Sequence, residues 1–249
     1  MIKAYVKSFL RTAFKILPLR FIPLDAALRF TQRISAVIAR MLFVRDWQLE
    51  AQGRPQFFKH LSNMSTWPFA PMRWAFTARG VYARENMFKG SKVLDLCCGD
   101  GSYSYLFFSD IAGRIDAVDN DIQAITYARK YFSSSTTEHY QIDIVNQPLP
   151  SADYDFVVWN AAICYFDEFA IRRVLSKIVD AGKQSMKLTG MLPKANGWVD
   201  HKTEFSDSAE VERLLLKYFK TVSIKEVDEG TTITFYFQAS SPLPTEPVL

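Results

Sequence analysis

Several features are scarce in this sequence, and each scarcity excludes a class of protein. The three cysteines, Cys97, Cys98 and Cys164, include no Cys-x-x-Cys pair, so neither a disulfide framework nor a metal site is expected. This cysteine usage favours a reducing cytoplasm. Basic residues interrupt every apolar stretch, so no run approaches the ~20 residues that span a bilayer, and no apolar segment suits a secretory signal.

Acidic residues are nearly absent from residues 1–45, where nine Lys and Arg accompany Asp25 alone. The rest of the chain has 21 basic and 25 acidic residues. Two amphipathic helices are predicted, one up to Pro18 and one from about Asp25 to Val44. The first carries a basic face in which every fourth residue is basic: Lys3, Lys7, Arg11 and Lys15. Three interpretations of this extension stay open: an anchor on an anionic membrane surface, a segment packed on the domain or a second subunit, and a targeting peptide.

Residues 46–90 are rich in aromatic side chains and contain three prolines. This composition predicts short helices and turns. A helix is expected from Thr77 to Lys89, ending at Gly90. Because the segment precedes a glycine-rich loop, we expect it to form a cap over a ligand cleft and to contact the substrate.

The glycine-rich loop follows the apolar run Val93–Leu96 and contains Gly99 and Gly101. Glycines let the backbone approach a ligand closely, and the helix predicted to begin after Gly101 offers unpaired N–H groups. A strand, a tight turn and a helix start together predict a ligand cradle.

Strands and helices alternate over residues 91–240. Apolar strands are predicted at Lys92–Leu96, Arg114–Val118, His139–Ile142, Tyr154–Trp159 and near Ser185–Leu188, with helices at Asp121–Phe132 and Asp167–Asp180. This rhythm is typical of an α/β, doubly wound, mostly parallel sheet. After a helix capped by Ser206 or Asp207, a short glycine-containing connection joins Thr221–Val227 to Thr231–Gln238 and predicts an antiparallel hairpin. The Pro-rich tail, residues 241–249, is expected to be loose.

Polar residues follow the ends of successive predicted strands: Asp95, Asp119 with Asn120, Asp143 with Ile144, and Asn160. In such sheets ligands bind at the carboxyl ends of the strands. Three carboxylates there repel an anionic dinucleotide but suit a ligand with hydroxyl groups and a positive charge. Asp119 can accept hydrogen bonds from ribose hydroxyls, and Asp143 can accept one from an adenine amine.

These motifs resemble those of the class I S-adenosylmethionine-dependent methyltransferases over residues 77–240, from Asp95-x-Cys97-x-Gly99-x-Gly101 to the terminal hairpin. The resemblance implies a seven-stranded Rossmann-like sheet and S-adenosylmethionine as methyl donor. It also implies a role for each matching position: the loop from Asp95 to Gly101 for the methionine moiety, Asp119 for the ribose, Asn120, Asp143 and Ile144 for the adenine, and Asn160 for the border of the methyl-donor pocket. Cys97 stands where the family often has a glycine.

Methyl transfer from a sulfonium needs alignment of the reacting groups, and a base only when the acceptor must lose a proton. The candidates for that base are His201 and Tyr165, although a histidine there is more often a surface loop residue and a tyrosine more often a packing residue. His60 lies in the cap segment. His139 is predicted to be the first residue of a strand and to lie away from the cleft.

The acceptor is expected to be a small molecule, a lipid or a lipid-linked glycan. Ala161-Ala162 follow Asn160 in place of the paired prolines of nucleic-acid amino-methylating members, and the mildly acidic body disfavours nucleic acid. We expect a cytoplasmic protein, associated with a membrane surface if residues 1–45 bind one, and a homo-oligomer stays open. Two alternatives are a silent module that serves as an assembly subunit and a nicotinamide-dependent oxidoreductase. Ser104 occupies the third glycine position of the nicotinamide fingerprint, which favours the methyltransferase.

Overall fold

The computed structural model describes residues 30–31, 34, 71–195, 200–229 and 232–244. The predicted basic extension, most of the cap segment, His60 and the end of the tail therefore lie outside the described residues. Contacts divide the chain into two compact units, one of residues 1–54 and 65–70 and one of residues 55–64 and 71–249. The second unit holds every element from α4 onward. Within the described residues, no helix has the length and apolar character needed to cross a membrane.

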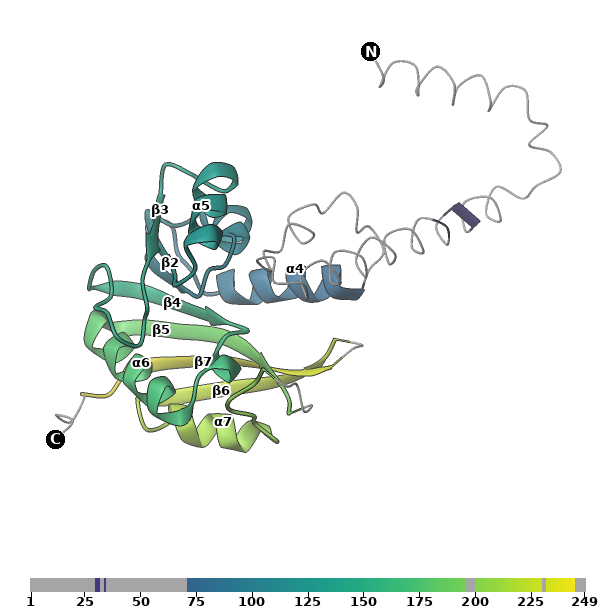
Figure 1. The fold of residues 1–249 in the computed structure, drawn as a ribbon. Helices are drawn as coiled ribbons and strands as arrows, with labels where there is room; N and C mark the ends of the chain where they lie inside the picture. The colour runs from purple at the N-terminus through teal and green to yellow at the C-terminus, as the bar shows by residue number, and fades with distance from the viewer. Residues whose placement is uncertain (1–29, 32–33, 35–70, 196–199, 230–231, 245–249) are drawn as a thin grey trace, which may run out of the picture. The chain divides into compact units, whose positions relative to one another are not determined.

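A seven-stranded sheet forms the centre of the second unit (Figure 1). Its strands are β1 (Lys92–Leu96), β2 (Arg114–Asp119), β3 (Thr137–Gln141), β4 (Tyr154–Asn160), β5 (Gly182–Pro193), β6 (Phe219–Asp228) and β7 (Ile233–Pro242). The order across the sheet is β3-β2-β1-β4-β5-β7-β6. Strands β1 to β5 pair in parallel, whereas β7 is antiparallel to both β5 and β6. The predicted fold class, including the closing hairpin, is confirmed.

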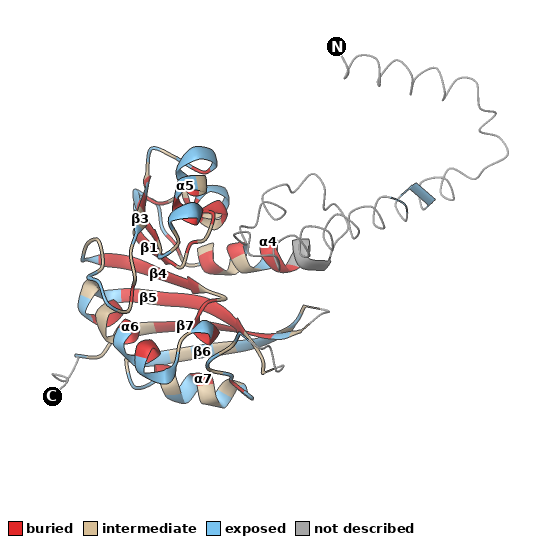
Figure 2. Ribbon diagram, in the orientation of Figure 1, coloured by how far each residue is buried: buried red, intermediate tan, exposed pale blue. Residues whose placement is uncertain are grey.

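Helices cover both faces of the sheet. One face carries α4 (Pro71–Arg84), the π-helical turn η2 (Ser104–Phe108) and α5 (Ile122–Tyr131), which share a core with Val93, Ile115 and Phe156. The other face carries α6 (Glu168–Ala181) and α7 (Ser208–Leu215), which pack on Leu94 and Trp159. The short 3-10 helix η3 (Ile163–Tyr165) joins β4 to α6. Because both faces are covered, β4 is buried along nearly its whole length and β5 along its second half, as Figure 2 shows.

Two predicted elements differ most from their bounds in the structure. The helix expected at Thr77–Lys89 begins at Pro71, since a proline fits the first turn, and ends at Arg84. The residues after Arg84 form turns, and Gly90 (φ 85) belongs to a turn before β1 and does not end the helix. The strand expected near Ser185–Leu188 is much longer, because β5 pairs with β4 on one side and β7 on the other.

Candidate active site

The order of strands reverses between β1 and β4. From this point β2 and β3 extend the sheet on one side, and β5, β7 and β6 extend it on the other. Loops after two such neighbouring strands diverge and leave a crevice at their carboxyl ends. Leu96 pairs with Trp159, so Cys97 and Asn160 follow as neighbours at this crevice. The structure thus brings together the residues predicted from the first and fourth strands.

The loop after β1 has an unusual backbone, with left-handed conformations at Cys97 (φ 57), Gly99 (φ 55) and Gly101 (φ 75). At Gly101 there is also no room for a side chain, because an added Cβ would lie 2.8 Å from His139 Nε2. At Cys97 a side chain in this conformation costs about 1–2 kcal/mol, which is typical of functional loops. The sequence therefore folds here into a tight cradle in which Cys97 and Gly99 are half-buried and Gly101 is buried.

Asp119 ends β2 and ties this cradle to the next helix. Its carboxylate accepts hydrogen bonds from the N–H groups of Gly99 at 3.0 Å and Asp121 at 2.9 Å. Burial raises the pKa of Asp119, and these N–H groups oppose that shift. Asn120, the next residue, is exposed. Asp119 is thus already oriented and retains lone pairs for a ligand.

Asp95 is the most electrostatically perturbed of the carboxylates predicted to bind the ligand. It is 3% exposed and accepts a hydrogen bond from Ser104 Oγ at 2.6 Å. Burial raises the pKa of Asp95 to about 7; the nearby Asp119 and Asp100 carboxylates add to this shift, whereas the Ser104 hydroxyl opposes it. A bound cation would relieve this accumulation of negative charge.

The side chains of the loop after β3 make contacts within the protein. Asp143 caps its own turn, accepting from the N–H of Val145 at 2.9 Å and from Asn146 Nδ2 at 2.7 Å. Contacts with Asn146 hold its pKa below the ordinary value. The Ile144 side chain is buried in the core beneath the loop, so only its backbone can reach a ligand. The Ile142 N–H donates to the Asp119 carbonyl at 2.9 Å, which holds this loop beside the end of β2.

Three buried polar atoms near the ends of β1 and β4 have no hydrogen-bond partner in the described part of the chain: Asp100 Oδ2, Trp159 Nε1 and Asn160 Nδ2. An unpaired buried polar atom costs about 1–3 kcal/mol, and most such atoms in proteins find partners. Together with the carboxylates of Asp95 and Asp119, they fit a polar ligand that carries hydroxyl groups and positive charge.

The two candidate bases, His201 and Tyr165, lie side by side although they are distant in sequence. Their rings meet edge to face with centroids 5.3 Å apart. The His201 side chain is buried, with Nδ1 3.8 Å from Glu204 Oε1, whereas Tyr165 is 45% exposed. The pair is held by the backbone, since the Lys202 N–H donates to the Cys164 carbonyl at 2.8 Å. Burial raises the pKa of Tyr165, so its phenol stays protonated at neutral pH.

Two parts of the site were not predicted from the sequence. His139 lies within β3, and its ring supports Gly101, so the prediction that it begins a strand away from the cleft is wrong. Burial and the nearby Arg129 lower the pKa of His139. On the α4 face, Arg79 forms a buried ion pair with Glu229. No local pattern joins these two residues, because they are 150 positions apart.

Comparisons with known proteins agree with this geometry. A family model described as a methyltransferase domain matches residues 93–185. Uncharacterized methyltransferases of Mycobacterium tuberculosis and Mycobacterium bovis are each 30% identical over 139 residues, which cover 53% of this chain and 68% of the relative.

Solved structures share the fold. The DhpI–SAH complex has a TM-score of 0.56 at 19% identity and covers 70% of this chain and 87% of its own. The [4+2]-cyclase SpnF has a TM-score of 0.54 at 12% identity, and the match covers 66% of this chain and 81% of the cyclase. This chain therefore belongs to the class I S-adenosylmethionine-dependent methyltransferase family, as its mycobacterial relatives, the cradle after β1, the acid that ends β2 and the antiparallel hairpin together indicate.

Proposed function

We propose that the protein transfers the methyl group of S-adenosylmethionine directly, in line, to a small-molecule, lipid or lipid-linked glycan acceptor. The observation that carries the proposal is the convergence of Asp95, Asp119 and Asn160 at the carboxyl ends of β1, β2 and β4. When bound, S-adenosylmethionine supplies a methyl group on a sulfonium, which is an excellent leaving group. The protein then has mainly to bind, align and exclude water.

Each part of the site has a task in this proposal. The backbone from Cys97 to Gly101 approaches the methionine end, and the Asp95 carboxylate attracts its positive charge. Asp119, preset by two N–H groups, accepts from the ribose hydroxyls. The exposed Asn120 and the loop of Asp143 and Ile144 lie at the adenine end. The unpaired Asn160 Nδ2 offers a donor at the border of the methyl pocket.

For an acceptor that must lose a proton, His201 is the proposed base, and Tyr165, whose raised pKa keeps its phenol protonated at neutral pH, would lie beside it as a hydrogen-bond donor. A carboxylate within reach of Nδ1, here that of Glu204, orients an imidazole so that its other nitrogen can take a proton. Tyr165 presents its exposed ring at the same place. Their position beyond β4 follows from η3, which begins three residues after Asn160.

A membrane-bound acceptor is supported by the charge of residues 1–45 alone. Flotation with anionic liposomes tests it, because electrostatic attraction to anionic lipids would carry the full chain upward but not a chain that starts at Arg45. Equal recovery of both chains in the unbound fraction would contradict a membrane role for this segment.

Calorimetry with S-adenosylmethionine tests the proposed function. Asp119→Ala removes charge-assisted hydrogen bonds to two hydroxyls and is expected to weaken binding about hundredfold. Asp110→Ala removes a carboxylate that is exposed and paired with Arg84, and is expected to leave affinity unchanged. No binding by the wild-type chain, or equal binding by Asp119→Ala, would overturn the proposal and favour a silent module of the same fold.

A further inference from the structure

Four polar side chains form a connected cluster on the α4 face: Arg79, Tyr103, Glu229 and Tyr236, here called the polar arch. Arg79 Nε lies 3.0 Å from Glu229 Oε1, and a second guanidinium nitrogen binds Glu229 Oε2. The Tyr236 hydroxyl donates to Glu229 Oε1 at 2.6 Å. Tyr103 is close enough to Arg79 for the guanidinium to act on the pKa of its phenol. The arch therefore joins α4, the start of η2 and the β6–β7 hairpin.

The arch lies beside the proposed methyl-donor site. Tyr103 comes two residues after Gly101, and the Asp95 carboxylate acts electrostatically on it. At the other end, Asn160 pairs with Met191 and Met191 pairs with Tyr236, so these three side chains share one face of the sheet. The arch thus runs from the donor loop to β7 on the face that carries Asn160, where an acceptor has to approach the methyl group.

Aromatic rings surround this polar cluster. Phe76 of α4 packs on Tyr103 with ring centroids 4.4 Å apart and on Phe107 at 5.7 Å. Tyr82, nearly two turns further along α4, meets Tyr236 edge to face at 5.0 Å. The surroundings of the arch are therefore suited to an apolar body, and its polar atoms are suited to one small polar group on that body.

The charges of the arch restrict that polar group. Arg79 and Glu229 neutralise each other, and their side chains are only 22% and 3% exposed. A carboxylate on the ligand would face Glu229, and an ammonium would face Arg79, with little water to screen either repulsion. A hydroxyl both donates and accepts, which matches the guanidinium donors of the arch and the oxygens of its two phenols and its carboxylate.

We propose that the polar arch is the acceptor-recognition site and that it selects a neutral hydroxyl group on an apolar body, such as a phenol or a lipid alcohol. This inference rests on the proposed methyltransferase function and specifies its substrate class. Arg79, Glu229 and Tyr236 act in it as specificity-determining residues, distinct from the donor-binding loop.

The test compares three probes that share one apolar body: 4-nonylphenol, 4-nonylaniline and 4-nonylbenzoate. The full-length chain is incubated with tritiated S-adenosylmethionine, and label in the organic phase is measured. Transfer to the phenol is expected to exceed transfer to the other two by more than about tenfold, because the benzoate brings a negative charge against Glu229 and the nitrogen of the neutral aniline accepts hydrogen bonds poorly. Tyr236→Phe and Glu229→Gln are expected to raise KM for the phenol about tenfold while the Kd for S-adenosylhomocysteine stays unchanged.

Tyr131→Phe, at a tyrosine that is 53% exposed on α5, is the matched control and is expected to match the wild-type chain. Binding of S-adenosylhomocysteine shows that each variant is folded. If wild type binds it but prefers the aniline or the benzoate, or labels none of the three, the hydroxyl assignment is overturned. Unchanged KM in both arch variants overturns the arch as the recognition site. Failure of wild type to bind S-adenosylhomocysteine overturns the proposed function instead.

Discussion

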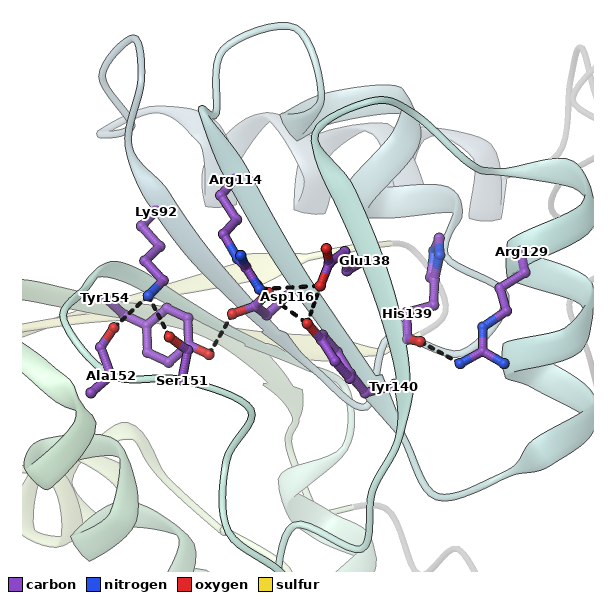
Figure 3. A network of polar contacts seen from close by, with 10 residues as sticks. All are labelled: Lys92, Arg114, Asp116, Arg129, Glu138, His139, Tyr140, Ser151, Ala152 and Tyr154. Carbon is purple, nitrogen blue, oxygen red and sulfur yellow. Dashed lines mark hydrogen bonds and ion pairs between the residues drawn. The ribbon is translucent and has the colours of Figure 1, made fainter.

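The two ends of the parallel strands differ in how their buried charges are paired. Near the amino ends, Asp116 is fully buried and accepts from Arg114 Nε at 2.9 Å and from the Tyr154 hydroxyl at 2.8 Å. Arg114 extends this network to Glu138 and Tyr140 of β3, as Figure 3 shows. Every charged group drawn in this network has a partner of opposite sign or a polar partner.

At the carboxyl ends, carboxylates are buried without cations. In the part of the chain that the structure describes, no basic side chain pairs with Asp95, Asp100 or Asp119. Their partners are N–H groups and one hydroxyl, and their pKa values are raised chiefly by burial. The amino ends are therefore built for stability, whereas the carboxyl ends keep an unbalanced charge, which the proposed cationic ligand would complete.

The largest expected effect comes from comparing two glycine-to-alanine substitutions, one at each end of β1. Gly101 and Gly90 both have left-handed backbones, but a Cβ at Gly101 would clash with His139, whereas a Cβ at Gly90 would meet no atom within 4 Å. Gly101→Ala is expected to displace the cradle and weaken S-adenosylmethionine binding about thousandfold by calorimetry. Gly90→Ala pays a similar backbone strain of about 1 kcal/mol and should bind normally. Equal affinities for the two variants would show that the loop is not the cradle.

The next largest effect is a loss of stability that leaves S-adenosylmethionine binding unchanged. Asp116→Ala leaves the fully buried Tyr154 hydroxyl and the Nε–H of Arg114 without their acceptor and is expected to lower the free energy of unfolding by about 3 kcal/mol in urea titrations. Glu138→Gln, at a side chain 60% exposed on the rim of the same network, should cost at most about 0.5 kcal/mol. Both variants should bind S-adenosylmethionine as wild type does. A loss of affinity in Asp116→Ala at unchanged stability would remove the distinction between the two ends.

The positions of the central strands could be predicted because β1 and β4 are continuous apolar runs bounded by turns. The convergence of Asp95, Asp119 and Asn160 followed from topology alone, since parallel strands end at one edge. The length of β5 could not be predicted. Position 190 within β5 requires a glycine, because an added Cβ would come 2.2 Å from the Trp159 carbonyl oxygen. In a sequence, however, a glycine usually indicates that a strand is interrupted, so the predicted strand was too short.

Side-chain orientation and long-range pairing limited the prediction of the site. Asp143 and Ile144 follow β3 as predicted, but no periodicity in a loop shows that Ile144 turns into the core. His139 was misplaced because its contact with Gly101 crosses from one strand to the loop of another. The ion pair of Arg79 and Glu229 depends on α4 packing near a hairpin at the opposite end of the chain.

The smallest expected effect is a pH dependence that originates at the carboxyl ends. The pKa of Asp95 is about 7 in the fold, against an ordinary value of 3.8. Between about pH 4 and pH 7, the folded state therefore holds a proton on Asp95 that the unfolded chain has lost. The contribution of Asp95 to the free energy of unfolding is complete below about pH 4 and is lost as the pH rises through about 7. Between pH 5 and pH 8, the free energy of unfolding of wild type should fall by about 2 kcal/mol relative to that of Asp95→Asn. Parallel pH profiles would contradict this.

The same carboxylate should also respond to the ligand. Because a bound cation favours the ionised carboxylate, S-adenosylmethionine binding near pH 6 should release a proton in wild type but not in Asp95→Asn. Calorimetry in buffers of different ionisation enthalpy measures this release.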